Sequence, residues 1–252
     1  FRFSAISASR DYVGLDNFLR LLGDDVFWTS LLNTLRFAGA SVVVQVGLGT
    51  VLAAFLHRGV TRLKNTYRFA IFVPMVMSVV AVGLLWTLIY DPIMGLLNQL
   101  LSFIGIEARG WLADPDTAIW AIIAAACWQY TGFTMVIVLA GMESISSQLY
   151  EAALIDGAGE VKSFFWITVP MVRHVIAVAV LITVIGSFKV FDYVWVMTRG
   201  GPAHASEVMT TYMYLLAFTT DRMGLGSAVA SYIFGITLAI TAFRIPSLRI
   251  SR

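Results

Sequence analysis

Residues 148–170 read QLYEAALIDGAGEVKSFFWITVP, a polar segment with two closely spaced glycines that separates two long apolar runs. The pattern predicts two short helices, the second over residues 160–168. The candidate caps of the first helix are Ser146 or Ser147 at its start and Gly157 or Gly159 at its end. A helix of about ten residues is about 15 Å long, far too short to cross a bilayer. This segment is therefore expected to lie outside the membrane.

The chain as a whole belongs to the membrane class. Of its 252 residues, 59% are hydrophobic and 13% are charged, whereas a soluble domain has about 25% charged residues. A helix needs about 20 mostly apolar residues to cross a bilayer, because lipid offers its backbone no hydrogen-bond partners. The stretches that qualify are residues 31–56, 69–90, 118–142, 172–197 and 225–243. We therefore expect an all-α, polytopic integral membrane helical bundle with five spans, formed by residues 1–252 as a single transmembrane domain.

Lys and Arg predict the orientation of the spans, because cytoplasmic loops collect basic residues. The connection after the first span is basic without any acid and is expected inside, whereas residues 91–117 are mostly acidic and are expected outside. Alternation then places residues 143–170 inside and residues 198–224 outside. Residues 1–30 are expected outside, as an amphipathic segment with Phe18, Leu21 and Leu22 on one side. The basic residues are Arg58, Arg62, Lys64 and Arg68 in the inner connection and Arg244, Arg249 and Arg252 in the tail, which is also expected inside.

The polar segment resembles the EAA loop of ABC importer permeases. That motif is written EAA, three residues, Gly, nine residues, Ile, one residue and Leu-Pro. The matching residues are Glu151, Ala152, Ala153, Gly157, Ile167 and Pro170, with Val169 where Leu is usual. The side chains of Ala152 and Ala153 are small, so one side of the first helix is expected to be nearly bare and open to close approach by another protein.

Further segments resemble the maltose-type sugar permeases of this family and extend the likeness over nearly the whole chain. These segments are YVGLDNF (residues 12–18), FVPMVMSVVAVGLLW (residues 72–86), WLADP (residues 111–115) and TRGGPAHASEVMTTYMYLLAF (residues 198–218). In that family one further membrane helix precedes the first of them. The resemblance therefore implies six spans in the native protein.

The resemblance implies a permease subunit of an ATP-binding-cassette importer in the plasma (inner) membrane of a bacterium or archaeon. The EAA loop would be a cytoplasmic coupling helix docked on a separate ATPase subunit. Its coupling residues would be Glu151, Ala152, Ala153, Asp156, Gly157, Ile167 and Pro170. The expected partners are a second homologous permease, two ATPase subunits, membrane lipid and an external solute-binding protein that delivers a sugar or sugar-like solute. ATP and Mg would bind the ATPase subunits, so neither a cofactor nor a catalytic residue is expected in this chain.

Polar and aromatic side chains within the spans are candidates for the solute path, because polar groups in lipid are costly and tend to face a cavity or a partner helix. They are Trp128, Gln129, Tyr130 and Phe133 on the third span and Thr183, Ser187, Lys189 and Asp192 on the fourth. Hydroxyl and amide groups can hydrogen-bond a sugar, and aromatic faces can stack on its C–H groups. The alternatives are helix-to-helix hydrogen bonds for the hydroxyls, a Lys189–Asp192 pair and aromatic packing alone.

Other functional classes find little support in the sequence. The 17 Lys and Arg residues against 15 Asp and Glu are too balanced to indicate nucleic-acid binding. The stretch GAGEVKS at residues 157–163 lacks the Gly before Lys that a P-loop requires. The three histidines are scattered and Cys127 lies alone in an apolar run, so neither a metal site nor redox chemistry is expected. The alternative function is a secondary transporter or channel independent of ATP, which would need an ion-coupling acid in mid-membrane, and Asp192 lies near one end of its span.

Overall fold

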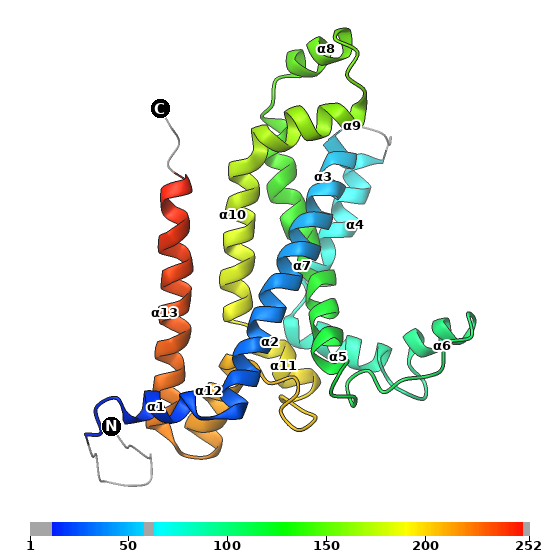
Figure 1. Ribbon diagram of the computed structural model, residues 1–252. Coiled ribbons are helices and arrows are strands. Elements are labelled where there is room, and N and C mark those ends of the chain that lie inside the picture. Colours follow the sequence, from blue (N-terminus) through cyan, green and yellow to red (C-terminus); the bar gives the residue numbers. More distant parts are fainter. Residues whose placement is uncertain (1–11, 58–62, 249–252) are drawn as a thin grey trace.

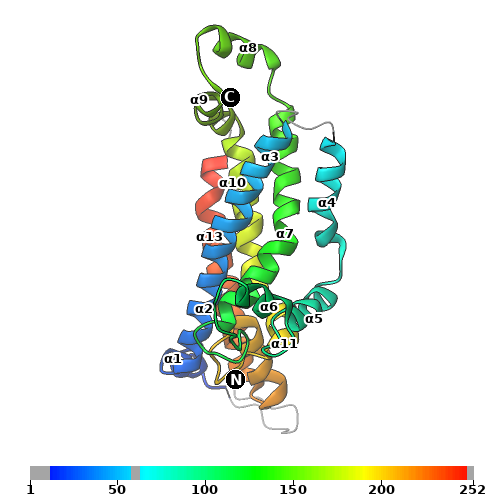
Figure 2. The same cartoon turned by 90° about the vertical axis from the view of Figure 1, so that its right-hand side faces the viewer.

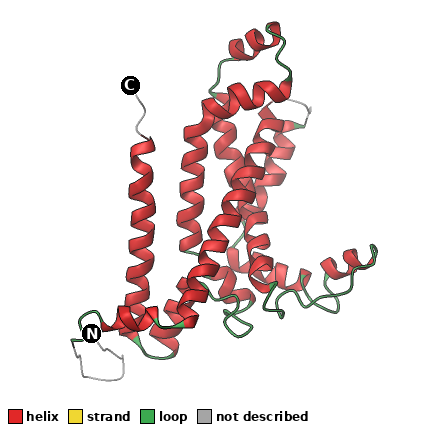
Figure 3. Ribbon diagram, viewed as in Figure 1, coloured by secondary structure: helices red, strands yellow, loops and turns green. Residues whose placement is uncertain are grey.

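The computed structural model describes residues 12–57 and 63–248, and every regular element among these residues is a helix (Figure 3). Four helices are long and apolar enough to cross a membrane, and a bent pair supplies a fifth span when it is counted as one. The predicted all-α membrane bundle of five spans is therefore confirmed. Arg58, Arg62, Arg249 and Arg252, which contributed to the predicted orientation, lie outside the described residues.

The first span is one apolar helix of 33 residues, Asp25–His57. It comprises α2 (Asp25–Ser41), the π-helical segment η1 (Val42–Leu48) and α3 (Gly49–His57). Asp24 caps this helix, because its Oδ1 accepts hydrogen bonds from the backbone N–H groups of Val26 and Phe27 at 2.9 and 3.3 Å. The cap explains why the span begins at Asp25 and not at the predicted residue 31.

Asp24 also ties the start of this span to α12 (Met209–Tyr214). The Tyr212 hydroxyl donates a hydrogen bond of 2.5 Å to Asp24 Oδ2. Burial and the bond to Asp24 raise the pKa of Tyr212 above its ordinary value, so the phenol keeps the proton that it donates. One carboxylate therefore caps a helix and joins two distant parts of the chain.

The helix α7 (Ala118–Glu143) lies at the centre of the bundle, between α3, α4 (Lys64–Val76) and α10 (Val169–Phe188) (Figures 1 and 2). Glycines let the neighbouring helices approach it closely. A Cβ atom on Gly132 would overlap the carbonyl oxygen of Ile71 on α4, and one on Gly49 of α3 would lie 3.0 Å from the backbone nitrogen of Met135. Small residues at such contacts are typical of helix packing in membranes.

The second span, predicted over residues 69–90, is broken. Its two parts, α4 (Lys64–Val76) and α5 (Val79–Ile89), meet at 98°. Pro74 near the end of α4 lacks a backbone N–H and disfavours continuation of the helix, and the chain becomes extended at Met77, where ψ is 150°. The α5 helix consequently runs sideways toward α6 (Leu96–Ser102), which projects from the bundle (Figure 1).

The polar segment at residues 148–170 forms two short helices, but the second is continuous with the next span. The first, α8 (Ser147–Ile155), stands beyond the bundle (Figures 1 and 2). The second, α9 (Glu160–Ser163), continues through the π-helical η2 (Phe164–Thr168) into α10 (Val169–Phe188), as one helix of 29 residues. The π turn and Pro170 are both helix-bending features, and they account for the bend between α9 and α10 in Figure 1.

The fourth span ends earlier than the predicted residue 197. The chain leaves helical geometry after Phe188, with φ values of −105° at Lys189 and −132° at Phe191, and a separate helix, α11 (Asp192–Met197), follows. Lys189 and Asp192 flank this turn, but residues 172–197 as a whole are apolar, so mean hydropathy alone does not reveal it.

The last span, α13 (Met223–Leu248), agrees with the prediction for residues 225–243. The loop predicted over residues 198–224 contains α12 and the π-helical η3 (Leu215–Thr219), which pack with α1 (Asp16–Leu22) against the start of α13. Within α1, Phe18 and Leu21 join this cluster, whereas Leu22 is 44% exposed, so the expectation that all three share one apolar side is wrong for Leu22.

The loops that the charge analysis assigns to opposite faces lie at opposite ends of the bundle. The helices α1, α6, α11 and α12 gather at one end, and α8 lies at the other (Figures 1 and 2).

Replacing Gly132 by Ala tests the close contact between α7 and α4. The new methyl group would meet backbone atoms that cannot rotate away, so we expect a loss of about 1–3 kcal/mol of stability, as for other overpacked sites. The measurement is the melting temperature of the purified protein in detergent. Gly39→Ala is the control, because a Cβ there meets nothing within 4 Å. Equal melting temperatures for the two variants would contradict the contact.

Candidate translocation cavity and coupling helix

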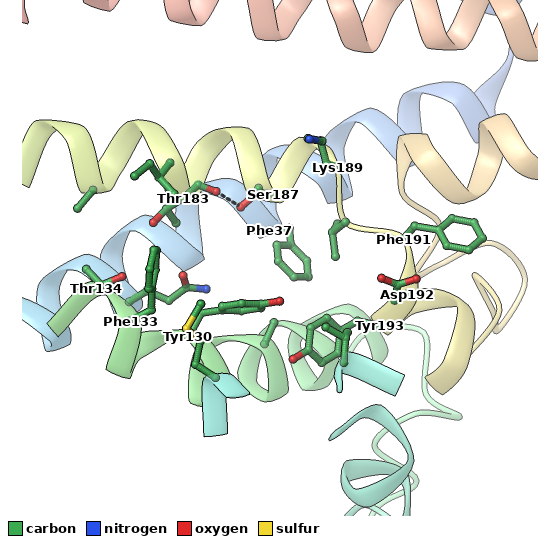
Figure 4. Close-up of a pocket in the computed structure, with 18 of the residues that line it drawn as sticks. Phe37, Tyr130, Phe133, Thr134, Thr183, Ser187, Lys189, Phe191, Asp192 and Tyr193 are labelled. Atoms are coloured by element: carbon green, nitrogen blue, oxygen red, sulfur yellow. Dashed lines mark hydrogen bonds between the residues drawn. The ribbon is translucent and has the colours of Figure 1, made fainter. Parts of the chain in front are cut away.

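A cavity of about 270 Å³ lies between α7 and α10, near the end of the bundle that carries α11 (Figure 4). Side chains from α2, η1, α4 and α5 complete its walls. Its volume is close to the lower end of the range of about 300–1,000 Å³ that small-molecule sites occupy. The space is therefore sufficient for part of a binding site.

The wall formed by α10 carries two hydroxyl groups one helical turn apart. Thr183 and Ser187 are 9% and 4% exposed, and both line the cavity. The Ser187 hydroxyl donates to the Thr183 carbonyl at 2.8 Å (Figure 4). Its oxygen keeps a lone pair that can accept a hydrogen bond from a solute.

The wall formed by α7 is aromatic and weakly polar. Tyr130, Phe133 and Thr134 line the cavity, and Phe37 of α2 faces them across it (Figure 4). Rings and hydroxyl groups therefore surround the same space, as the sequence predicts for Tyr130 and Phe133 on this helix.

Lys189 and Asp192 lie at the α11 end of the cavity and are both exposed. Their side chains diverge, and the lysine amino group points away from the carboxylate (Figure 4). No salt bridge joins them in the described part of the chain. The alternative that these two charges pair with each other is therefore not observed.

Trp128 and Gln129 lie outside the cavity. The Trp128 ring packs edge-on against Trp86 with their centroids 5.8 Å apart. Gln129 is fully buried, donates from Nε2 to the Met77 carbonyl at 2.8 Å and accepts a hydrogen bond from the Tyr193 hydroxyl. Gln129 thus has buried partners and fastens α7 to the break between α4 and α5 and to α11.

Several cavity residues, among them Gln45, Phe37 and Tyr193, were not identified from the sequence as part of the solute path. Gln45 is a polar residue within the first span, but nothing in the sequence connects it with α10. Phe37 and Tyr193 are aromatic residues among many in the spans, and only the packing of α2 and α11 against α7 brings them to the cavity.

The helix α8 has well-defined ends. The Ser146 side chain accepts a hydrogen bond from the Gln148 backbone N–H at 3.4 Å. At the other end Gly157 has φ of +75°, a conformation that favours glycine. The N–H groups of Ala158 and Gly157 bond to the carbonyls of Ala153 and Leu154 at 2.8 and 3.1 Å, which is the Schellman pattern of helix ends. Of the two glycines considered from sequence, Gly157 is therefore the one that stops the helix.

The outer surface of α8 is exposed and partly apolar. Ile155 is 87% exposed, and Leu154, which borders the cavity beneath α8, is 73% exposed. Ala152 is exposed but Ala153 is buried, so the expectation that both alanines form a bare outer surface is wrong for Ala153. The remaining predicted coupling residues are distributed as follows: Glu151, Asp156, Gly157 and Pro170 are exposed, and Ile167 is half-buried.

The inner side of α8 faces a second cavity, of about 330 Å³, between this helix, the end of α3 and η2. Tyr150 lies at its edge. The Tyr150 hydroxyl is 2.9 Å from Thr168 Oγ1 in η2, and its ring lies 5.8 Å from the His57 ring on α3.

The described residues contain no group of three or more His, Cys, Asp or Glu side chains that could hold a metal ion. The single cysteine, Cys127, is buried beside Ser41 and Gln45.

Comparison with solved structures supports the architecture. Two crystal structures of a bacterial ABC transporter that imports the acidic polysaccharide alginate, one of them in complex with an alginate pentasaccharide-bound periplasmic protein, match with TM-scores of 0.87 and 0.86 at 26% identity. These matches cover 97% and 96% of this chain and 86% of the transporter chain in each case.

Sequence comparison gives the family. A probable ABC transporter permease protein of Bacillus subtilis, YurN, is 41% identical, with 96% of this chain and 84% of YurN covered. The trehalose/maltose transport system permease protein MalF of Thermococcus litoralis is 36% identical, with 92% of this chain and 78% of MalF covered. Residues 45–249 match the model of binding-protein-dependent transport system inner membrane components. The chain belongs to this family of ABC transporter permeases.

Proposed function

We propose that this chain is the permease subunit of an ATP-driven importer of a sugar or sugar-like solute, in the plasma (inner) membrane of a bacterium or archaeon. The observation that carries the proposal is the placement of α8. This exposed, well-capped helix stands beyond one end of the bundle (Figure 1). The chain leads from it into the span whose other end forms the cavity wall.

The lining of the cavity supports a sugar as the solute. Hydroxyl groups of Thr183 and Ser187, the amide of Gln45 and the ring of Tyr130 surround one space. Polar groups of this kind can hydrogen-bond sugar hydroxyls, and a ring can cover the apolar face of a sugar ring. A relative named for trehalose/maltose transport and a structural neighbour that imports alginate support the same solute class.

The proposal includes partners for each exposed part of the chain. An external solute-binding protein would deliver the solute at the end that carries α11 and α12. A second homologous permease would complete the solute path beside the exposed faces of α10 and α13, and lipid would surround the pair. Two ATPase subunits would bind ATP and Mg and receive α8, so this chain would itself hydrolyse nothing.

In the proposed mechanism, closure of the ATPase subunits on ATP displaces α8 and, with it, the helix that begins at Glu160. Since this helix continues to Phe188, the displacement reaches Thr183 and Ser187. The spans then change from an arrangement open on one side to one open on the other, as expected when a ligand favours one of two conformations.

Uptake by vesicles tests the proposal. The complete complex would be reconstituted with ATP inside or outside, and uptake of labelled maltose, trehalose and lactose would be measured with the binding protein present. We expect uptake of at least one of these sugars that requires both ATP on the α8 side and the binding protein. Uptake driven by an ion gradient without ATP would overturn the proposal in favour of secondary transport.

Gly157→Val tests the role of the α8 terminus. A residue other than glycine at this φ costs about 1–2 kcal/mol, and a cost of that size changes a population about 5–30-fold. We expect binding-protein-stimulated ATP hydrolysis and uptake to fall accordingly. The matched control is Gly159→Val, since Gly159 has φ of −67° and a Cβ at either glycine meets nothing within 4 Å. Equal activity of the two variants would contradict the proposed role.

Cysteine crosslinking tests the docking surface. Ala152 is exposed and Ala153 is buried, so we expect Ala152→Cys to crosslink to the ATPase subunit in the assembled complex and Ala153→Cys to crosslink little. Labelling of Ala152→Cys in intact cells by an impermeant reagent added outside would show that α8 is not cytoplasmic.

Tyr130→Ala tests the solute path. Because Tyr130 lines the cavity and Trp128 does not, we expect uptake to fall about tenfold in Tyr130→Ala, equivalent to about 1.4 kcal/mol, and to change little in Trp128→Ala. The measurement is the initial rate of sugar uptake at equal amounts of assembled complex. A larger loss in Trp128→Ala would place the solute elsewhere.

A further inference from the structure

The helix α8 makes only sparse contacts with the spans. It stands beyond the end of the bundle on two connecting segments (Figures 1 and 2). Beneath it lies the cavity of about 330 Å³ bordered by Ala54 and His57 of α3 and by Phe164 of η2. A helix that stands over such a space can tilt or sink without moving the spans, unless some contact joins it to them.

Tyr150 supplies this contact. Its hydroxyl group lies 2.9 Å from Thr168 Oγ1, and no other side-chain hydrogen bond joins α8 to another helix within the part of the chain that the structure describes. The Tyr150 ring also lies 5.8 Å from the ring of His57, at an angle of 51°. The tyrosine is therefore positioned between the ends of two spans.

Thr168 is well placed to receive a displacement. It is 3% exposed, and its hydroxyl donates to the Ser163 carbonyl at 3.5 Å, so its oxygen can accept a hydrogen bond from the Tyr150 hydroxyl. It ends the π turn η2, and α10 follows directly with Thr183 and Ser187 on the cavity wall. Thr168 therefore lies at the base of the helix that forms that wall.

We propose that Tyr150 is a positioning residue, whose hydrogen bond to Thr168 transmits the displacement of α8 to the helix that lines the cavity. This inference rests on the proposed function. Without the bond, movement of α8 is absorbed by the space beneath it. ATP binding and solute access then become uncoupled, although α8 still docks on the ATPase.

The test uses the complete complex in vesicles and a cysteine introduced at Ile182, a cavity residue that is 43% exposed. The readout is the labelling rate of this cysteine by an impermeant maleimide, before and after addition of ATP, Mg and vanadate. Native Cys127 is 4% exposed and contributes little labelling. In the parent complex we expect the labelling rate to change with nucleotide.

In Tyr150→Phe, which keeps the ring but loses the hydroxyl, we expect the nucleotide-dependent change to shrink about fivefold, since loss of one hydrogen bond is worth about 1 kcal/mol. ATP hydrolysis and the Ala152→Cys crosslink should remain. Thr168→Ser keeps a hydroxyl and should show the same nucleotide-dependent change in labelling rate as the parent. In Thr168→Val this change should shrink as it does in Tyr150→Phe. The double variant Tyr150→Phe/Thr168→Val should show a nucleotide-dependent change no smaller than that of either single variant, because both substitutions remove the same hydrogen bond.

A Tyr150→Phe complex that assembles, and whose labelling rate changes with nucleotide as much as that of the parent, would overturn the inference and leave the proposed function intact. A selective loss of the Ala152→Cys crosslink would also overturn it, because the tyrosine would then act by holding the fold of α8. If the parent labelling rate did not respond to nucleotide at all, the proposed function would fail, and the inference with it.

Discussion

Every backbone polar group inside an apolar membrane layer needs a hydrogen-bond partner within the protein. At the break between α4 and α5, helical hydrogen bonds alone cannot meet this requirement. Gln129 meets it by donating to the Met77 carbonyl while it accepts a hydrogen bond from Tyr193. One buried amide therefore holds the broken span, α7 and α11 together. Since α5 and α11 both contribute to the cavity walls, the shape of the cavity depends on this amide.

The second feature on which the proposed function depends is an uninterrupted helix between the two ends of the bundle. The helix from Glu160 to Phe188 runs from the base of α8 to the cavity without a break. Its π turn and Pro170 bend it, but its backbone remains helical throughout. By contrast, α8 meets the spans at few points. The chain thus combines a helix with few contacts at one end of the bundle with a continuous helix toward the other end, which suits a subunit that is moved by a separate ATPase.

Much of this arrangement could be predicted from the sequence. Hydropathy located the spans, and Gly157 was one of two glycines expected to end α8. Hydropathy could not reveal the turn after Phe188 or the 98° bend after Pro74, because each lies within a stretch that is apolar on average, although Lys189 and Asp192 flank the first of them. The buried position of Ala153 and the hydrogen bonds of Gln129 to Met77 and Tyr193 depend on tertiary packing. For the same reason, Phe37 and Tyr193 were not recognised as cavity residues.

Distances measured by pulsed electron paramagnetic resonance would show whether α9 and α10 move as one body. Spin labels at Val161 and Ile182, which are 71% and 43% exposed, report on this helix, and a label at Trp128 reports on α7. With ATP, Mg and vanadate added to the complete complex, the Val161–Ile182 distance should stay constant while the Ile182–Trp128 distance changes. A changed Val161–Ile182 distance beside a constant Ile182–Trp128 distance would mean that η2 bends and absorbs the movement, and force transmission through this helix would be refuted.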